Sequence, residues 1–144
     1  MTTNEEHQTS SLIRDKWVYI DAEFDAQGIW TKGGSACSAH DVPVSEDVVQ
    51  RILEWQRRYN YEAPPPFDRE GYVWGSFDVE DFSRQGLDIA RALKTQLPDW
   101  TVVYFDLHKL FEANQLGKGE DRSYYEYEIK LLNSDQDVLQ GHEH

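Results

Sequence analysis

Residues 78–107 read DVEDFSRQGLDIARALKTQLPDWTVVYFDL, a stretch that joins an amphipathic helix to an apolar strand. Asp78 is a typical helix N-cap, and Pro98 prevents the helix from continuing. Between them, small and large apolar residues recur at spacings of three and four, as on the buried side of a helix. This buried stripe consists of Phe82, Gly86, Ile89, Ala90, Leu93 and Leu97. Gly86 and Ala90 permit close approach to a sheet, and Trp100 to Leu107 is expected to be its central strand.

Two further strands and one further helix extend this pattern in both directions. Trp17 to Asp25 and Tyr124 to Leu131 both alternate between apolar and polar residues, which is typical of half-buried strands. Ser45 to Asn60 has apolar residues at helical spacing, with Ser45 as its N-cap. The order strand, helix, helix, strand, strand predicts an α+β fold, a mostly antiparallel sheet with two amphipathic helices packed on one face.

The ends of the chain differ in composition from its middle. Residues 1–14 and 133–144 are polar with few large apolar side chains, so both are predicted to be flexible tails around a single α+β domain, residues 15–132. Within that domain, Asp25 to Gly28 resembles a turn and Thr31 to Val44 a loop. Three consecutive prolines begin a stiff connector, after which Phe67 to Phe77 is expected to hold a short strand.

The composition excludes several classes of function. The 144 residues carry a formal net charge of -13, and nucleic-acid binding needs clustered Lys and Arg, so direct contact with DNA or RNA is disfavoured. Binding to anionic membranes is disfavoured for the same reason. The polar first residues do not resemble a secretion signal, and the single cysteine, Cys37, suits a reducing compartment. We therefore expect a soluble cytoplasmic protein.

The negative charge is concentrated on the predicted strands. Their acidic residues are Asp21, Glu23, Asp25, Asp106, Glu126 and Glu128, against one base, Lys130. The two predicted helices are nearly neutral by comparison. Neighbouring like charges on a sheet repel each other, so such a face is a poor surface unless a cationic partner meets it. The distribution predicts a binding protein for a basic protein partner.

The predicted binding surface combines aromatic side chains with carboxylates. Aromatic residues supply contact area at low entropic cost, and carboxylates accelerate association with a basic partner. The residues predicted for this surface from the two alternating strands are Trp17, Tyr19, Asp21, Glu23, Tyr124, Glu126 and Glu128. The loop residues Tyr72 and Trp74 form a competing surface. The alternative that these are ordinary solvated strand residues remains open.

Catalytic and metal-binding motifs are weak in this chain. Cys37 and His40 have the spacing of half a zinc site, but the sequence has no second cysteine to complete a cysteine-rich one. No nucleophile motif surrounds Cys37. The acid pairs on the strands could imitate glycosidase carboxylates, yet they are expected on a flat sheet. No catalytic residue, cofactor or metal is predicted, although a small hydrolase using Cys37 or the strand carboxylates remains an alternative.

Four segments resemble a known family. They are Ser35 to Ser38, Trp55, Gly86 to Lys94, and Leu97 to Phe105, and together they span about the central half of the chain. The chain resembles the immunity proteins of bacterial polymorphic and contact-dependent growth-inhibition toxin systems. That resemblance implies a cytoplasmic inhibitor that binds a cognate toxin domain, often a basic nuclease, one-to-one and masks its active site. An acidic adaptor or regulatory subunit is the remaining alternative.

Overall fold

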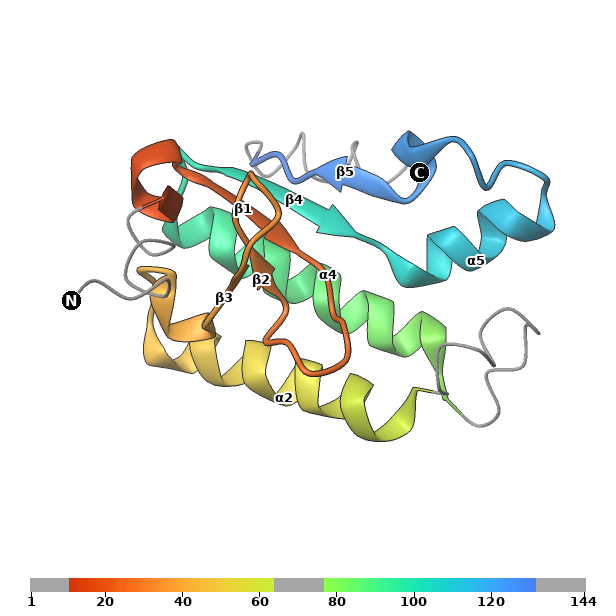
Figure 1. Ribbon diagram of the computed structural model, residues 1–144, viewed down its shortest axis with the longest axis horizontal. Helices are drawn as coiled ribbons and strands as arrows, with labels where there is room; N and C mark the ends of the chain where they lie inside the picture. The colour runs from red at the N-terminus through yellow and green to blue at the C-terminus, as the bar shows by residue number, and fades with distance from the viewer. Residues whose placement is uncertain (1–10, 64–76, 132–144) are drawn as a thin grey trace.

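The computed structural model describes residues 11–63 and 77–131 and confirms the α+β class (Figure 1). Residues 11–15 are helical and lead into the first strand. The strands are β1 (Trp17–Ile20), β2 (Ile29–Trp30), β3 (Ala36–Cys37), β4 (Thr101–Phe105) and β5 (Glu126–Glu128). The helices are α2 (Glu46–Glu62), α4 (Val79–Gln96) and α5 (Leu107–Gln115), with 3-10 turns η1 (Ala39–Asp41) and η2 (Arg122–Tyr124).

The five strands form one mixed sheet in the order β3-β2-β1-β4-β5. The pairs β1–β2, β2–β3 and β4–β5 are antiparallel, as the sequence predicts for most of the sheet. The central pair, β1 with β4, is parallel. A parallel pair needs a long crossover, and here both α2 and α4 lie between the two strands in the chain.

Helices α2 and α4 lie side by side on one face of this sheet, as predicted (Figure 1). Val18, Ile20, Val102 and Tyr104 point toward them and are fully buried. The indole of Trp55 in α2 stacks on Phe82 of α4, with ring centroids 4.9 Å apart. Its Nε1–H donates to the Phe82 carbonyl over 3.0 Å, so this large ring is buried without an unsatisfied donor.

Both long helices begin where their caps predict. The Ser45 hydroxyl accepts from the Val48 N–H at 3.4 Å, and the Asp78 carboxylate accepts from the Asp81 N–H at 3.0 Å. At the other end of α4, the buried Lys94 ammonium donates to the carbonyl of Pro98 at 3.0 Å. The two N-cap bonds satisfy backbone N–H groups that a helix leaves unpaired at its start, and the Lys94 bond ties α4 to the segment that follows it.

The first predicted strand is shorter than its alternation indicates. β1 ends at Ile20 instead of reaching Asp25, because the chain turns there toward β2. Asp25 and Gly28 both adopt positive φ, 63° and 82°, which no strand residue can hold. The predicted loop from Thr31 to Val44 contains β3 and η1, whose two-residue and three-residue lengths leave no periodic signal.

The predicted C-terminal strand is also wrong at both ends. β5 covers Glu126–Glu128, and Tyr124 belongs to η2. Leu131, the apolar last residue of the predicted strand, is 41 % exposed. Helix α5 is absent from the sequence prediction, because the apolar run that marks β4 continues through its first residue, Leu107.

The division into two tails and one domain stays a prediction. The described part of the expected N-terminal tail, residues 11–14, is helical, and its Leu12 is fully buried. The strand expected within Phe67 to Phe77 lies outside the described residues, apart from the buried Phe77. Within residues 11–63 and 77–131, no helix is long and apolar enough to cross a membrane.

Candidate partner-binding surface

The sheet face opposite α2 and α4, called the outer face here, carries aromatic side chains and carboxylates. Strand register places Tyr19 beside Val103 and Trp30, and Phe105 beside Glu126. Its large apolar and acidic members are Trp17, Tyr19, Trp30, Val103, Phe105, Glu126 and Glu128. All of them are half-buried except Glu128, which is exposed. The outer face is therefore partly accessible to a partner, and its half-buried aromatic rings distinguish it from an ordinary polar surface.

Tyr19 organises the centre of the outer face. Its ring stacks on Trp17 with centroids 6.3 Å apart and planes inclined by 17°. Its hydroxyl donates a short hydrogen bond of 2.5 Å to Oε2 of Glu126, across from β1 to β5. Burial, the bond to Glu126 and the charge of Asp21 raise the pKa of Tyr19 well above its ordinary value. The sequence prediction thus places Trp17, Tyr19, Asp21 and Glu126 in one neighbourhood, and the structure brings them together.

Glu126 is held ionised by a cation that the strand pattern does not reveal. Arg122 in η2 donates from Nη2 to Oε2 of Glu126 at 2.7 Å and from Nε to Oε1 at 3.4 Å. This hydrogen bond lowers the pKa of Glu126, against partial burial, which would raise it. On the same strand, Glu128 pairs with Lys130 at 3.1 Å. Arg122 and Lys130 therefore offset part of the negative charge that the strand residues alone place on the outer face.

Asp21 and Glu23 lie just beyond β1, in the segment that leads to β2. The Asp21 carbonyl accepts from Nε1–H of Trp30 at 2.8 Å. Glu23 is tied to helix α2 through its backbone, because Gln56 accepts from its N–H at 3.2 Å and donates to its carbonyl at 2.7 Å. Both side chains are half-buried. The prediction that they continue the strand alternation is wrong, although Asp21 stays close to Tyr19.

Two other strand acids have local structural roles. The buried Asp106 is the N-cap of α5, where Oδ1 accepts from the Lys109 N–H at 3.1 Å. Its Oδ2 accepts from the Tyr127 hydroxyl at 2.7 Å, so it also joins β5 to α5. Asp25 is exposed at its positive φ. Neither extends the carboxylate group on the outer face.

Tyr124 is directed away from the position expected for it. In η2 its ring lies near two lysines, with Nζ of Lys109 5.7 Å and Nζ of Lys118 5.9 Å from the ring centroid. The 3-10 turn breaks the two-residue alternation that would have placed Tyr124 beside Glu126. Tyr72 and Trp74 lie outside the described residues.

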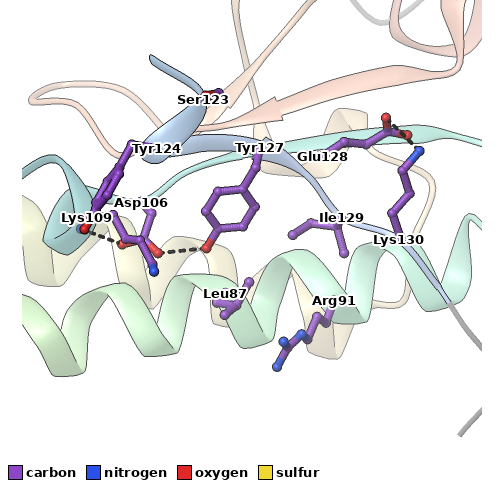
Figure 2. A pocket seen from close by; sticks show the side chains of 10 residues that line it. All are labelled: Leu87, Arg91, Asp106, Lys109, Ser123, Tyr124, Tyr127, Glu128, Ile129 and Lys130. Carbon is purple, nitrogen blue, oxygen red and sulfur yellow. Dashed lines mark hydrogen bonds and ion pairs between the residues drawn. The ribbon is translucent and has the colours of Figure 1, made fainter. Parts of the chain in front are cut away.

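A hollow of about 340 Å³ lies on the other side of β5, between this strand, α4 and the start of α5 (Figure 2). Tyr127 of β5 and Ile129, the residue after this strand, point into it, and Leu87 and Arg91 line it from α4. The remaining lining residues are Asp106, Lys109, Ser123, Tyr124, Glu128 and Lys130. No signal in the sequence marks this groove, because its lining comes from α4, α5 and β5, which are separate segments of the chain.

The cysteine alternative gains no support from the geometry. Cys37 is buried, and burial together with Asp41 raises the pKa of its thiol to about 11, opposite to what a reactive thiolate needs. His40 pairs with Glu46 at 3.1 Å, and Asp41 accepts from the Ser38 N–H. Among residues 11–63 and 77–131, no three His, Cys, Asp or Glu side chains gather as a metal site would require.

Comparison with known proteins identifies the family. No curated protein and no solved structure matches the chain significantly. One family model, described as Serratia CdiI immunity protein-like, matches residues 16–107. The match spans β1 to β4 with both long helices and ends before β5, and it confirms the resemblance seen in the sequence. Because it covers more than half of the chain, the protein belongs to the Serratia CdiI immunity protein-like family.

Proposed function

We propose that this protein neutralises a cognate toxin by binding its toxic domain one-to-one in the cytoplasm, without catalysing a reaction. The family match over residues 16–107 is the observation that carries this role. The finer proposal is that the partner is basic, most simply a nuclease domain, because such a domain carries the Lys and Arg that phosphate contacts need. The net charge of -13 complements a partner of that kind.

The outer face is the proposed contact surface. Trp17 and Tyr19 are already stacked and half-buried, so docking on them costs little side-chain entropy. Rigid aromatic side chains of this kind often provide most of the binding energy at protein interfaces. The predicted contact residues on this face and just beyond β1 are Trp17, Tyr19, Asp21, Glu23, Glu126 and Glu128. Tyr124, which lies in η2 and off the outer face, and the loop residues Tyr72 and Trp74 stay predicted contacts.

The carboxylates around Tyr19 supply the charge complementarity. Arg122 already keeps Glu126 ionised, and its own side chain is 63 % exposed. A lysine or arginine of the toxin could approach Glu126 and Asp21 from the side not taken by Arg122. Charges near an interface act mainly on the association rate and on the choice of partner, whereas the aromatic contacts act on the dissociation rate.

The test compares two variants of equal net charge. One neutralises the proposed surface with Asp21→Asn, Glu23→Gln, Glu126→Gln and Glu128→Gln. The control neutralises four exposed acids of the helices with Glu54→Gln, Glu62→Gln, Glu80→Gln and Asp88→Asn. Each is titrated by calorimetry against the toxin domain encoded beside the gene, and each is co-expressed with that toxin to score growth.

We expect the surface variant to bind at least about ten-fold more weakly and to protect cells poorly, while the control stays within about three-fold of wild type. Equal weakening of both variants would mean that only the net charge matters, and the outer face would then be the wrong surface. If wild type neither binds the toxin nor protects the cells, the proposed function itself is wrong.

A further inference from the structure

The groove between β5, α4 and α5 has walls of two chemical kinds. Leu87 and Ile129 form an apolar part, with the ring of Tyr127 beside them (Figure 2). Its volume of about 340 Å³ lies at the lower end of the range of roughly 300–1,000 Å³ found for ligand pockets. The groove is thus sized for one or two side chains of a partner.

The side chains that line the groove carry three positive charges, on Arg91, Lys109 and Lys130, and two negative charges, on Asp106 and Glu128. Both carboxylate oxygens of Asp106 are engaged by the Lys109 N–H and the Tyr127 hydroxyl, and Glu128 is paired with Lys130. Arg91 and the Lys109 ammonium form no ion pair with any residue that the structure describes. They flank the groove from α4 and from α5. A cationic rim around apolar walls is unexpected on a chain with a net charge of -13.

We propose that this groove binds an acidic side chain and an adjacent apolar side chain from a segment of the toxin domain. The apolar side chain would lie against Leu87 and Ile129, and the carboxylate would pair with Arg91 and Lys109. This inference rests on the proposed function, because the occupant belongs to the same partner that meets the outer face.

The two surfaces together would fix how the partner is oriented. Along β5 the side chains alternate, so that Glu126 faces the outer side and Tyr127 faces the groove. The outer face would bind a cationic side chain of the partner, and the groove would bind an anionic one. A partner docked in the reverse orientation would bring its anion to the acidic outer face and its cation to Arg91 and Lys109, and both contacts would be repulsive. Such repulsion is an effective way to reject incorrect partners and orientations.

A peptide titration tests the groove without the toxin. The probe is acetyl-Glu-Phe-Glu-amide, with acetyl-Lys-Phe-Lys-amide as reference, added to the ¹⁵N-labelled full chain in 150 mM NaCl. The net charge of the protein repels the acidic probe, so its binding must come from a local site. We expect saturable shifts of the Leu87 and Ile129 amide signals with the acidic probe, and no saturable shifts at these positions with the reference.

Charge variants then assign the contact. The double substitution Arg91→Gln with Lys109→Gln should weaken binding of the acidic probe by about ten-fold or more. The control Arg51→Gln with Arg57→Gln removes the same charge from α2 and should leave it unchanged. Absence of saturable shifts, equal shifts with both peptides, or unchanged binding by the groove variant would overturn the proposal. The proposal would also be overturned if the chain self-associates and the groove variant abolishes that self-association. The occupant of the groove would then be a second copy of this chain.

The toxin domain provides the second measurement. If wild type binds the toxin, the groove variant should bind it about ten-fold more weakly than the α2 control does. Binding within two-fold of that control would overturn the groove proposal while leaving the proposed function intact. Failure of wild type to bind the toxin would instead overturn the proposed function and, with it, the toxin segment as occupant of the groove.

Discussion

Gly86 of α4 lies directly against Trp55 of α2 and Tyr104 of β4. A Cβ atom at this position would lie 2.6 and 2.8 Å from two ring carbons of Trp55, and it would also collide with the Tyr104 hydroxyl. Tyr104 donates to the Ser83 carbonyl at 2.7 Å, and Trp55 is bonded to the Phe82 carbonyl. Neither ring can withdraw without leaving a buried polar group unsatisfied.

Substitution of Gly86 by alanine should therefore destabilise the fold. The better helix propensity of alanine contributes about 1 kcal/mol, but the forced displacement of two buried rings costs more. We expect a net loss of about 2 kcal/mol in the free energy of unfolding, measured by urea denaturation. Asp88→Ala, on the exposed side of the same helix, should change it by less than about 0.5 kcal/mol. A stabilised Gly86→Ala variant would show that the helix can move away from the sheet.

Glu126 predicts a pH dependence of stability. Its pKa in the folded state is lowered from 4.5 by Arg122, so its ionised form stabilises the fold above the unfolded-state pKa. That contribution is lost as the pH falls through the lower folded-state value. The stability difference between wild type and Glu126→Gln should therefore be about 1 kcal/mol at pH 7 and should shrink below pH 4.5. A difference that stays constant from pH 7 to pH 3 would contradict this role of the ion pair.

At the scale of elements, the periodic patterns predict α2, α4 and the inner side of the sheet, because each runs long enough to repeat. They fail where an element is short, or where one residue fits both the end of a strand and the start of a helix. Asp106 ends an apolar run and so resembles a strand residue, yet it begins α5 by capping it. The strand pattern does not indicate Arg122 as part of the surface, because Arg122 lies four residues before Glu126 in a turn and not on a strand.

The double role of Asp106 gives an element-scale prediction. Asp106→Ala removes the cap of α5 and leaves the partly buried Tyr127 hydroxyl without its acceptor, so we expect a loss of about 2 to 3 kcal/mol by urea denaturation. Asp121 is the matched control, because it lies at the N-cap of η2 without making a side-chain cap bond. Asp121→Ala should cost less than about 0.5 kcal/mol. Similar losses in both variants would mean that the Asp106 cap does not hold β5 against α5.

At the scale of the whole molecule, the net charge follows from the composition alone, whereas the position of the charged side chains on the folded surface does not. The sequence correctly indicates that Tyr19 and Glu126 share one face, because β1 and β5 keep their alternation. It misses the groove, which α4, β5 and the start of α5 line, and it misses the parallel pairing of β1 with β4. Pairing direction is a property of the crossover and leaves no trace in local periodicity.

The net charge of -13 predicts opposite salt responses for folding and for binding. Salt screens the repulsion within the folded chain, so the melting temperature of the free protein should rise between 20 and 500 mM NaCl, with the Debye length falling to below about 8 Å. The same screening removes the attraction of a basic partner, so the association rate with the toxin domain should fall by about ten-fold or more over that range.

Both four-residue neutral variants have the same net charge and should show the same weakened rise in melting temperature. Only the outer-face variant should lose the salt dependence of the association rate, measured by stopped-flow fluorescence, because that rate depends on where the carboxylates lie. Equal loss in the helix variant would leave net charge as the whole explanation and remove the outer face from the encounter.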